Sequence, residues 1–264
     1  RGVRPSLARG GGEARPGRCG RGATGPGRAR PPLSRPGSLC YLGGEMGTGA
    51  LTVLYEDNHL LAVAKPAGVL VQGDASGDPT LFEAAKAYLK ERYAKPGNVY
   101  LGLVHRLDRP VSGLVLFART SKAAARLSAQ FREGRAHKTY LAVVEGVPAP
   151  AAGELACWLA AEGDAQGKTA AAASPFPGAR EARLRYQVRE RGAGAALLEV
   201  EPATGRRHQI RVQLAAAGHP VLGDVKYGAR GPRVGEGIAL HAWRLTVAHP
   251  VGGAEATLEA PPPP

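Results

Sequence analysis

The residues best suited to chemistry lie in the stretch His105-Arg106-Leu107-Asp108-Arg109-Pro110-Val111-Ser112-Gly113. Asp108 stands between two arginines, whose positive charges favour the ionised form of a carboxylate. Pro110 and Gly113 are turn residues, and the apolar run Leu114–Ala118 that follows is typical of a buried strand. The sequence therefore predicts Asp108 on a loop beside a core strand, where catalytic side chains are often held. From these residues alone, a solvated Arg-Asp-Arg cluster is the more ordinary interpretation.

A second informative stretch combines glycines with basic side chains near a predicted helix start. It comprises Thr204-Gly205-Arg206-Arg207-His208-Gln209-Ile210-Arg211, then Gly218-His219-Pro220-Val221-Leu222-Gly223-Asp224, and then Tyr227-Gly228. Glycines permit close backbone approach, and cations at a helix start favour anions. Phosphate binding is the chemistry that this pattern indicates, although the pattern is not specific.

The elements that must position these residues follow from periodicity and turn signals. Strands are predicted at residues 51–55, 60–64, 114–118, 139–144, 153–159, 184–188, 196–200 and 239–247. Helices are predicted from Thr80, with Glu83 completing a capping box, from about Ser121 to a stop at Gly134, and over 209–217. In the second helix Ala124, Leu127 and Phe131 form the expected buried face, and residues 160–180 are expected to be a loop or insertion. The expected fold class is α+β, with a mixed, largely antiparallel sheet and flanking helices.

Composition restricts the class of partner. The chain has 264 residues and a formal net charge of +13, which suggests a polyanionic partner such as nucleic acid. Only 5% of the residues are aromatic, which argues against a long stacking platform for single strands. The 3 cysteines show no C-x-x-C pairing, so a reducing compartment is expected. No apolar run approaches the length of a membrane span.

The chain divides into three segments by composition. Residues 1–45 are mostly Arg, Gly, Pro and Ala and are expected to be a disordered basic tail. This tail is interpreted as an RNA-binding arm, as an organelle transit peptide, or, the interpretation we favour, as translated leader outside the natural protein. The only Met, Met46, stands just before the patterned region. The catalytic domain is expected over 46–258, and 259–264 as a disordered Pro-rich end.

Taken together, these motifs resemble those of the RluA-type pseudouridine synthases. The matching segments are His105–Asp108 with Ser112-Gly113, Lys65-Pro66-Ala67-Gly68, Lys138-Thr139-Tyr140-Leu141, Thr204–Arg211, Gly218–Asp224, Leu240-His241-Ala242 and His249-Pro250. They occur in the family's order and span residues 55 to 250. The family usually has Thr where this chain has Val111, which removes one hydroxyl from the loop.

The resemblance implies a role for each matching residue. Asp108 is the nucleophile, Arg211 its basic partner with Arg206 as the competing candidate, and Tyr140 packs on the uracil and assists C5 deprotonation. Arg106 fills the space of the extruded base. Contacts to RNA are expected from Arg106, Arg109, Arg206, His208, Lys65, Arg126 and Arg132. No cofactor is expected because the isomerisation transfers no electron and loses no group. A metal is not expected either, since His105, His208, His219 and His241 lack metal-ligand spacing.

The sequence thus predicts an RNA pseudouridine synthase that isomerises uridine in structured ribosomal or transfer RNA. The alternative is a non-catalytic RNA-binding protein on the same scaffold. A carboxylate-dependent glycosidase is less favoured, because no second acid is convincingly paired with Asp108. We expect a monomer without a membrane partner, in the bacterial cytoplasm, or in an organelle if the tail is a transit peptide. The target uridine is not specified by the sequence.

Overall fold

The structure, a computed structural model, describes residues 51–231 and 235–263. Its strands are β1 (Thr52–Glu56), β2 (Leu60–Lys65), β3 (Gly102–Leu103), β4 (Ser112–Ala118), β5 (His137–Glu145), β6 (Ala152–Ala160), β7 (Ala171–Ala172), β8 (Ala179–Arg191), β9 (Ala195–Pro202), β10 (Leu240–Ala248) and β11 (Glu255–Glu259). Its helices are α1 (Leu81–Arg92), α2 (Ser121–Arg132) and α3 (Gln209–Ala216), with a short 3-10 turn, η1 (Val225–Tyr227). The predicted tail, 1–45, and Met46 lie outside the described residues. Within them, no helix is long and apolar enough to cross a membrane.

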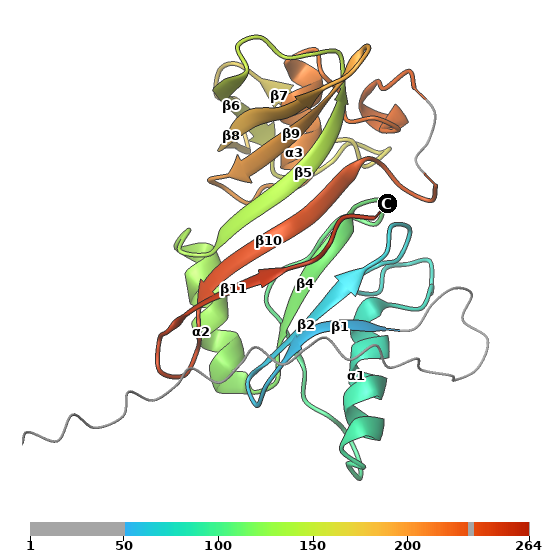
Figure 1. Ribbon diagram of the computed structural model, residues 1–264, viewed down its shortest axis with the longest axis vertical. Coiled ribbons are helices and arrows are strands. Elements are labelled where there is room, and N and C mark those ends of the chain that lie inside the picture. The colour runs from blue at the N-terminus through green and yellow to red at the C-terminus, as the bar shows by residue number, and fades with distance from the viewer. Residues whose placement is uncertain (1–50, 232–234, 264) are drawn as a thin grey trace, which may run out of the picture. The chain divides into compact units, whose positions relative to one another are not determined.

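All the strands belong to one mixed sheet. Its order is β1-β2-β4-β10-β5-β9-β8-β6-β7, with β11 paired to β10 and β3 paired to β4. Among the pairs of named strands in the described chain, only β4 and β10 run parallel. Figure 1 shows β10 running alongside β5, where it joins the β1-β2-β4 half of the sheet to the β5-β9-β8-β6 half. The predicted α+β class with a largely antiparallel sheet is therefore confirmed.

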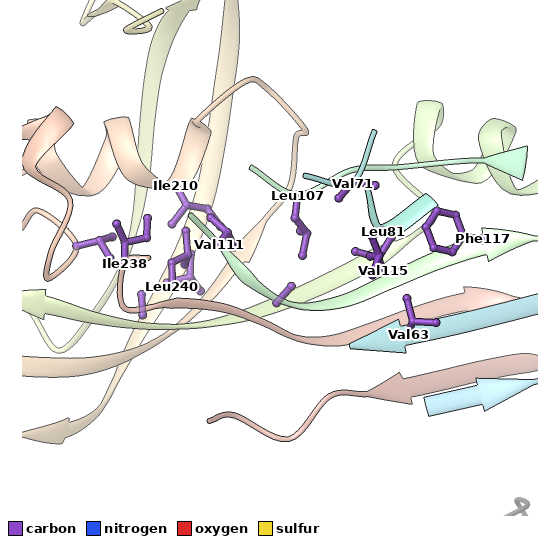
Figure 2. Packing of buried hydrophobic residues seen from close by; sticks show 14 of the residues in the cluster. Val63, Val71, Leu81, Leu107, Val111, Val115, Phe117, Ile210, Ile238 and Leu240 are labelled. Atoms are coloured by element: carbon purple, nitrogen blue, oxygen red, sulfur yellow. The ribbon is translucent and has the colours of Figure 1, made fainter. Parts of the chain in front are cut away.

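Strand β4 is apolar from Leu114 to Ala118 because both of its faces are covered there. Val115 and Phe117 pack in one hydrophobic cluster with residues of α1, and Figure 2 shows these side chains beside Val63 and Leu81. Leu116, pointing the other way, packs in a second cluster with residues of α2. A strand that is buried on both faces needs a continuous apolar run rather than an alternating one. Asp108 therefore lies just before one of the most deeply buried strands of the sheet.

Gly113 allows β4 and β10 to come together. Its φ of +119° lies in a region that favours glycine, and a Cβ atom at this position would stand 2.4 Å from the Ala242 carbonyl oxygen. Gly113 and Ala242 are register partners in the parallel pair. Any side chain here would force the two strands apart.

Both long helices begin where the sequence predicts. Thr80 caps α1, and Glu83 returns the bond in a complete capping box. Thr120 caps α2. The predicted face of α2 packs against the core, with Leu127 fully buried and Ala124 and Phe131 partly buried, and Gln130, which was not predicted there, is 4% exposed. The Gln130 amide bonds both the N–H and the carbonyl of Ala248, so a polar side chain docks α2 onto the end of β10.

Short strands account for the other differences from the predictions. Residues 160–180 include the end of β6, the start of β8 and the two-residue strand β7, so this segment is not entirely a loop. Strand β11 was not predicted. It ends at Glu259, and the next residue, Ala260, is 1% exposed and donates its N–H to the Trp243 carbonyl. Backbone pairing with β10 therefore continues to Glu259, one residue beyond the domain end predicted at 258.

Candidate active site

The loop that carries Asp108 joins β3 to β4, and two of its backbone carbonyls accept hydrogen bonds from distant segments. Lys65, at the end of β2, donates from Nζ to the Arg109 carbonyl at 3.0 Å. The Ile238 N–H donates to the Pro110 carbonyl at 3.1 Å. Because both bonds hold the chain immediately after Asp108, the carboxylate starts from a fixed position.

The residues on the C-terminal side of Asp108 tie the loop to the core. Val111 donates its N–H to the Asp108 carbonyl at 3.1 Å and buries its side chain in the cluster of Figure 2. Ser112 Oγ bonds His241 Nδ1 at 2.9 Å, and His241 Nε2 bonds the Ala260 carbonyl at 3.0 Å. A carbonyl only accepts, so the His241 proton is on Nε2, and Ser112 donates to Nδ1. The methyl groups of Val111 stand where the RluA-type synthases usually have a threonine hydroxyl.

Arg211 lies between two carboxylates. Its Nε and Nη2 donate to Asp224 Oδ2 and Oδ1 at 2.7 and 2.9 Å, a bidentate pair, while Nη1 approaches Asp108 Oδ2 at 3.2 Å. The side chains of Arg211 and Asp224 are 5% and 1% exposed, and that of Asp108 is 29% exposed. Burial opposes the charge on Arg211, but the two carboxylates raise its pKa above the ordinary value. Asp224 therefore fixes the guanidinium that faces Asp108.

The start of α3 places Arg211 and excludes Arg206 from the same role. Gln209 Oε1 accepts from the Thr204 hydroxyl at 2.8 Å and from the Arg206 N–H at 3.0 Å, which folds the preceding loop back onto the helix. Arg206 directs its Nε to the Glu181 carbonyl at 3.0 Å. Of the two arginines weighed from the sequence, Arg211 is the one paired with Asp108.

A pocket opens above Asp108. It is lined by Val104, His105, Arg106, Leu107, Asp108, Val111, Phe131, Lys138, Tyr140, Pro202, Thr204, Gly205, Arg206, Arg207, His208, Gln209, Ile210, Arg211 and Leu240. Five of these side chains are lysine or arginine, and Asp108 is the one carboxylate among the described lining residues. Such a pocket attracts an anionic ligand and holds a single acid ready to react. It offers no second acid for the two-carboxylate chemistry of a glycosidase.

Burial changes the protonation of the groups around Asp108. Burial first, and the Asp108 charge second, raise the pKa of Tyr140, so its phenol stays protonated. Burial lowers the pKa of Lys138. His105 stacks on Phe131 with ring centroids 4.8 Å apart and accepts the Leu116 N–H on Nε2 at 2.9 Å. Burial and the Lys138 charge lower the pKa of His105 to about 3, so its ring is neutral.

The structure brings together Asp108, Tyr140, Arg211, Arg106, Arg206 and His208 of the predicted site residues, since all of them line the pocket. Four predicted RNA contacts do not line it, namely Lys65, Arg109, Arg126 and Arg132.

One of these four assignments, Lys65, needs correction. Lys65 is 1% exposed, and its ammonium donates to the carbonyls of Pro66, Val69 and Arg109, so it holds the loop instead of meeting RNA. Arg126 directs Nη1 to the Pro250 carbonyl, which uses part of its donor capacity within the protein. Arg109 is exposed and pairs with Asp78 at 2.8 Å, and Arg132 is exposed at the end of α2.

Sequence reasoning assigned no role to Asp224 or Tyr227, although both stand in the motif region after α3. Asp224 fixes Arg211, as described above. Tyr227 Oη lies 2.7 Å from His208 Nδ1, and the Arg211 guanidinium carbon lies 5.0 Å from the Tyr227 ring centroid. Their place in the Gly218–Asp224 and Tyr227-Gly228 motif segments was the available signal.

Comparison with known proteins gives a consistent result. The family described as RNA pseudouridylate synthase matches residues 59–216. The dual-specificity RNA pseudouridine synthase RluA of Escherichia coli O6:H1 (strain CFT073) is 35% identical over 213 residues, covering 80% of this chain and 93% of that protein. Ribosomal large subunit pseudouridine synthase C of Escherichia coli (strain K12) is 35% identical over 231 residues, covering 79% of this chain and 66% of that protein.

Solved structures agree. Human RNA pseudouridylate synthase domain containing 4 has a TM-score of 0.67 at 26% identity, covering 80% of this chain and 88% of that one. The family match, the curated relatives and the shared fold agree, and the chain belongs to the RNA pseudouridylate synthase family. Its type within that family is the RluA type. The chain spans nearly all of RluA but only 66% of the large-subunit synthase.

Proposed function

We propose that this protein isomerises uridine to pseudouridine in structured RNA, either ribosomal or transfer RNA, with Asp108 as the nucleophile. The observation that carries the proposal is the placement of Asp108 against Arg211 in a pocket whose other charged lining residues are cationic. Family membership supports the same reaction, and the names of the relatives quoted above support RNA as the substrate.

The chemistry assigns a task to each residue. The N1–C1′ bond breaks, the uracil turns, and C5 joins C1′, after which C5 loses its proton and N1 gains one. Asp108 either attacks C1′ or removes the 2′ proton, and Arg211 orients it throughout. Tyr140 is a protonated phenol, so its oxygen takes the C5 proton only as its own proton leaves. Arg106, an exposed residue at the pocket, takes the place of the base that leaves its stack.

The alternative is an RNA-binding protein without activity on the same scaffold. The bidentate Arg211–Asp224 pair favours the enzyme, because it holds the guanidinium that faces the partly exposed Asp108. A surface that only binds RNA needs positive charge. It does not need a carboxylate among the cations, because a carboxylate repels phosphate. Localisation in the bacterial cytoplasm or an organelle, and a monomeric state, stay predictions.

The test is tritium release from C5-labelled uridine in a bound RNA under single-turnover conditions. Asp108→Asn keeps the size of the side chain and removes its charge, so the rate should fall about 10⁴-fold or more. RNA affinity should survive, because it comes mainly from phosphate contacts. Substantial release by Asp108→Asn would end the nucleophile assignment.

The phosphate contacts have a separate test with an internal control. Arg132→Ala should reduce the dependence of RNA affinity on salt, with the slope of log K against log salt falling by about 1. Arg126→Ala is the matched variant on the same helix. It should change the slope less, because the Arg126 guanidinium already donates to the Pro250 carbonyl. Equal effects of the two substitutions would contradict this division.

A further inference from the structure

His208 has an unusual backbone conformation at the edge of the pocket. It is the N-cap of α3, with φ 51° and ψ 19°, in the left-handed region that non-glycine residues seldom occupy. Its side chain makes no capping bond to the helix. It points instead toward Asp108, with Nε2 3.8 Å from Oδ2, and is 11% exposed. Such a conformation persists only where the surroundings hold it, and it often marks a functional position.

A chain of hydrogen bonds fixes the ring from behind. The Thr169 N–H donates to Tyr227 Oη at 2.9 Å, and Tyr227 Oη lies 2.7 Å from His208 Nδ1. The phenolic proton has no other acceptor in the part of the chain that the structure describes, so Tyr227 donates to Nδ1. A neutral imidazole that accepts on Nδ1 carries its proton on Nε2. The donor N–H of His208 therefore faces Asp108.

The surroundings keep the ring neutral. Burial lowers the pKa of His208 to about 4, with Arg211, Arg207 and Lys226 acting in the same direction and Asp108 opposing them. The ring is thus a neutral donor at physiological pH. It can orient the carboxylate without adding a further positive charge beside it.

The two groups that approach Asp108 share one oxygen. Arg211 Nη1 and His208 Nε2 both face Oδ2, at 3.2 and 3.8 Å. Oδ1 has no hydrogen-bond partner among the described residues. One oxygen is therefore bonded and the other is left to react.

We infer that His208 is a positioning residue for Asp108, which donates Nε2–H to Oδ2 in the RNA complex and leaves Oδ1 as the reacting oxygen. Tyr227 sets the tautomer, and the 161–170 segment holds Tyr227 through Thr169. The 3.8 Å separation shortens to a hydrogen bond when RNA closes the pocket, as catalytic contacts often do. This inference rests on the proposed function.

The first measurement concerns the protein alone. In the ¹⁵N spectrum of histidine-labelled protein, the resonance that disappears in His208→Gln identifies His208. In the parent its Nδ1 should have the shift of an unprotonated nitrogen and its Nε2 that of a protonated one. Tyr227→Phe should give a mixture of tautomers. A proton on Nδ1 in the parent protein would overturn the hydrogen-bond chain.

The second measurement is the single-turnover rate. Losing one hydrogen bond to a charged group corresponds to about a 10- to 100-fold loss, which is expected for His208→Leu, with unchanged RNA affinity. His208→Gln can place an amide N–H near Nε2 and should recover part of the rate. Tyr227→Phe keeps the ring under Arg211 and should lose rate by a smaller factor. Melting temperatures identify any variant whose loss comes from unfolding.

His137→Leu is the matched control. His137 is exposed on β5 and does not line the pocket, so the parental rate is expected. Parental rates in both His208→Leu and Tyr227→Phe would refute the positioning role. An inactive parent protein would instead refute the proposed function and the positioning role together, while the ¹⁵N measurement would still decide the tautomer.

Discussion

Replacing Asp224 by Asn should cost both stability and turnover. The substitution keeps the shape of the side chain and removes the charge that Arg211 contacts through Nε and Nη2. Arg211 is 4% exposed, so water cannot replace the lost carboxylate. Asp108 then becomes the remaining anionic partner of a buried guanidinium.

The magnitude follows from burial. Removing one partner of a buried ion pair costs about 3–5 kcal/mol, because the other charge stays in a poorly solvated site. Asn can still accept one hydrogen bond from Nη2, which places the expected loss near the lower end, at about 3 kcal/mol. The single-turnover rate should fall by about 10- to 100-fold, because Arg211 is no longer held by a bidentate bond as it faces Asp108.

Urea unfolding at neutral pH measures the first effect, and tritium release with RNA in excess of its dissociation constant measures the second. Glu259→Gln is the matched control, because Glu259 accepts from Arg244 Nε at 2.6 Å but the two side chains are 50% and 35% exposed. An exposed pair contributes less than about 1 kcal/mol. If Asp224→Asn cost no more than Glu259→Gln in stability and left the rate unchanged, the account of Arg211 as a residue fixed by Asp224 would be wrong.

Three further predictions test the framework around the pocket. Gly113→Ala should destabilise the fold by about 3 kcal/mol or more, through both its positive φ and the clash with the Ala242 carbonyl. Gly134→Ala, also at positive φ but with open space around it, should cost about 1 kcal/mol in the same melting experiment. The pKa of His105 is about 3 in the folded protein and near 6.5 in the unfolded chain, so the unfolded chain binds more protons between these values. Stability should therefore decrease as the pH is lowered from 6.5 towards 3. His105 contributes up to about 1.4 kcal/mol per pH unit, and urea midpoints of His105→Gln should depend less on pH. Lys65→Met removes the ammonium donor from three carbonyls, of which the Arg109 carbonyl keeps the Gly68 N–H, so it should lower both the melting temperature and the turnover rate. A change in RNA affinity alone would restore the phosphate-contact role.

The strongest local signals in the sequence predicted the framework of the site. The apolar run after Gly113 indicates a strand buried on both faces, and Thr80 with Glu83 indicates the start of α1. These features depend on residues close in sequence, so periodicity and capping suffice to find them. Asp108 on a loop before β4 follows from the same signals.

What the sequence could not supply was the choice of partner for each charge. Arg206 and Arg211 are equivalent as sequence letters, and only the turn of α3 directs one to Asp108 and the other to a carbonyl. Lys65 resembles a surface cation until the following turn folds its carbonyls around the ammonium. Strand β11 is short and exists because β10 presents an edge to it, which is a tertiary effect on a weak local pattern.

The central place of β10 has a consequence for synthesis on the ribosome. The chain completes β5 at Glu145, yet β10, which pairs with one edge of β5 from His137 to Ala142, begins only at residue 240. At about 5–20 residues per second, the nascent chain leaves this edge of β5 unpaired for on the order of ten seconds. An uncovered edge of this kind is a template for pairing with other chains. Efficient production should therefore depend on chaperones that bind nascent chains, and overexpression without them should yield aggregates seeded by the unpaired edge of β5.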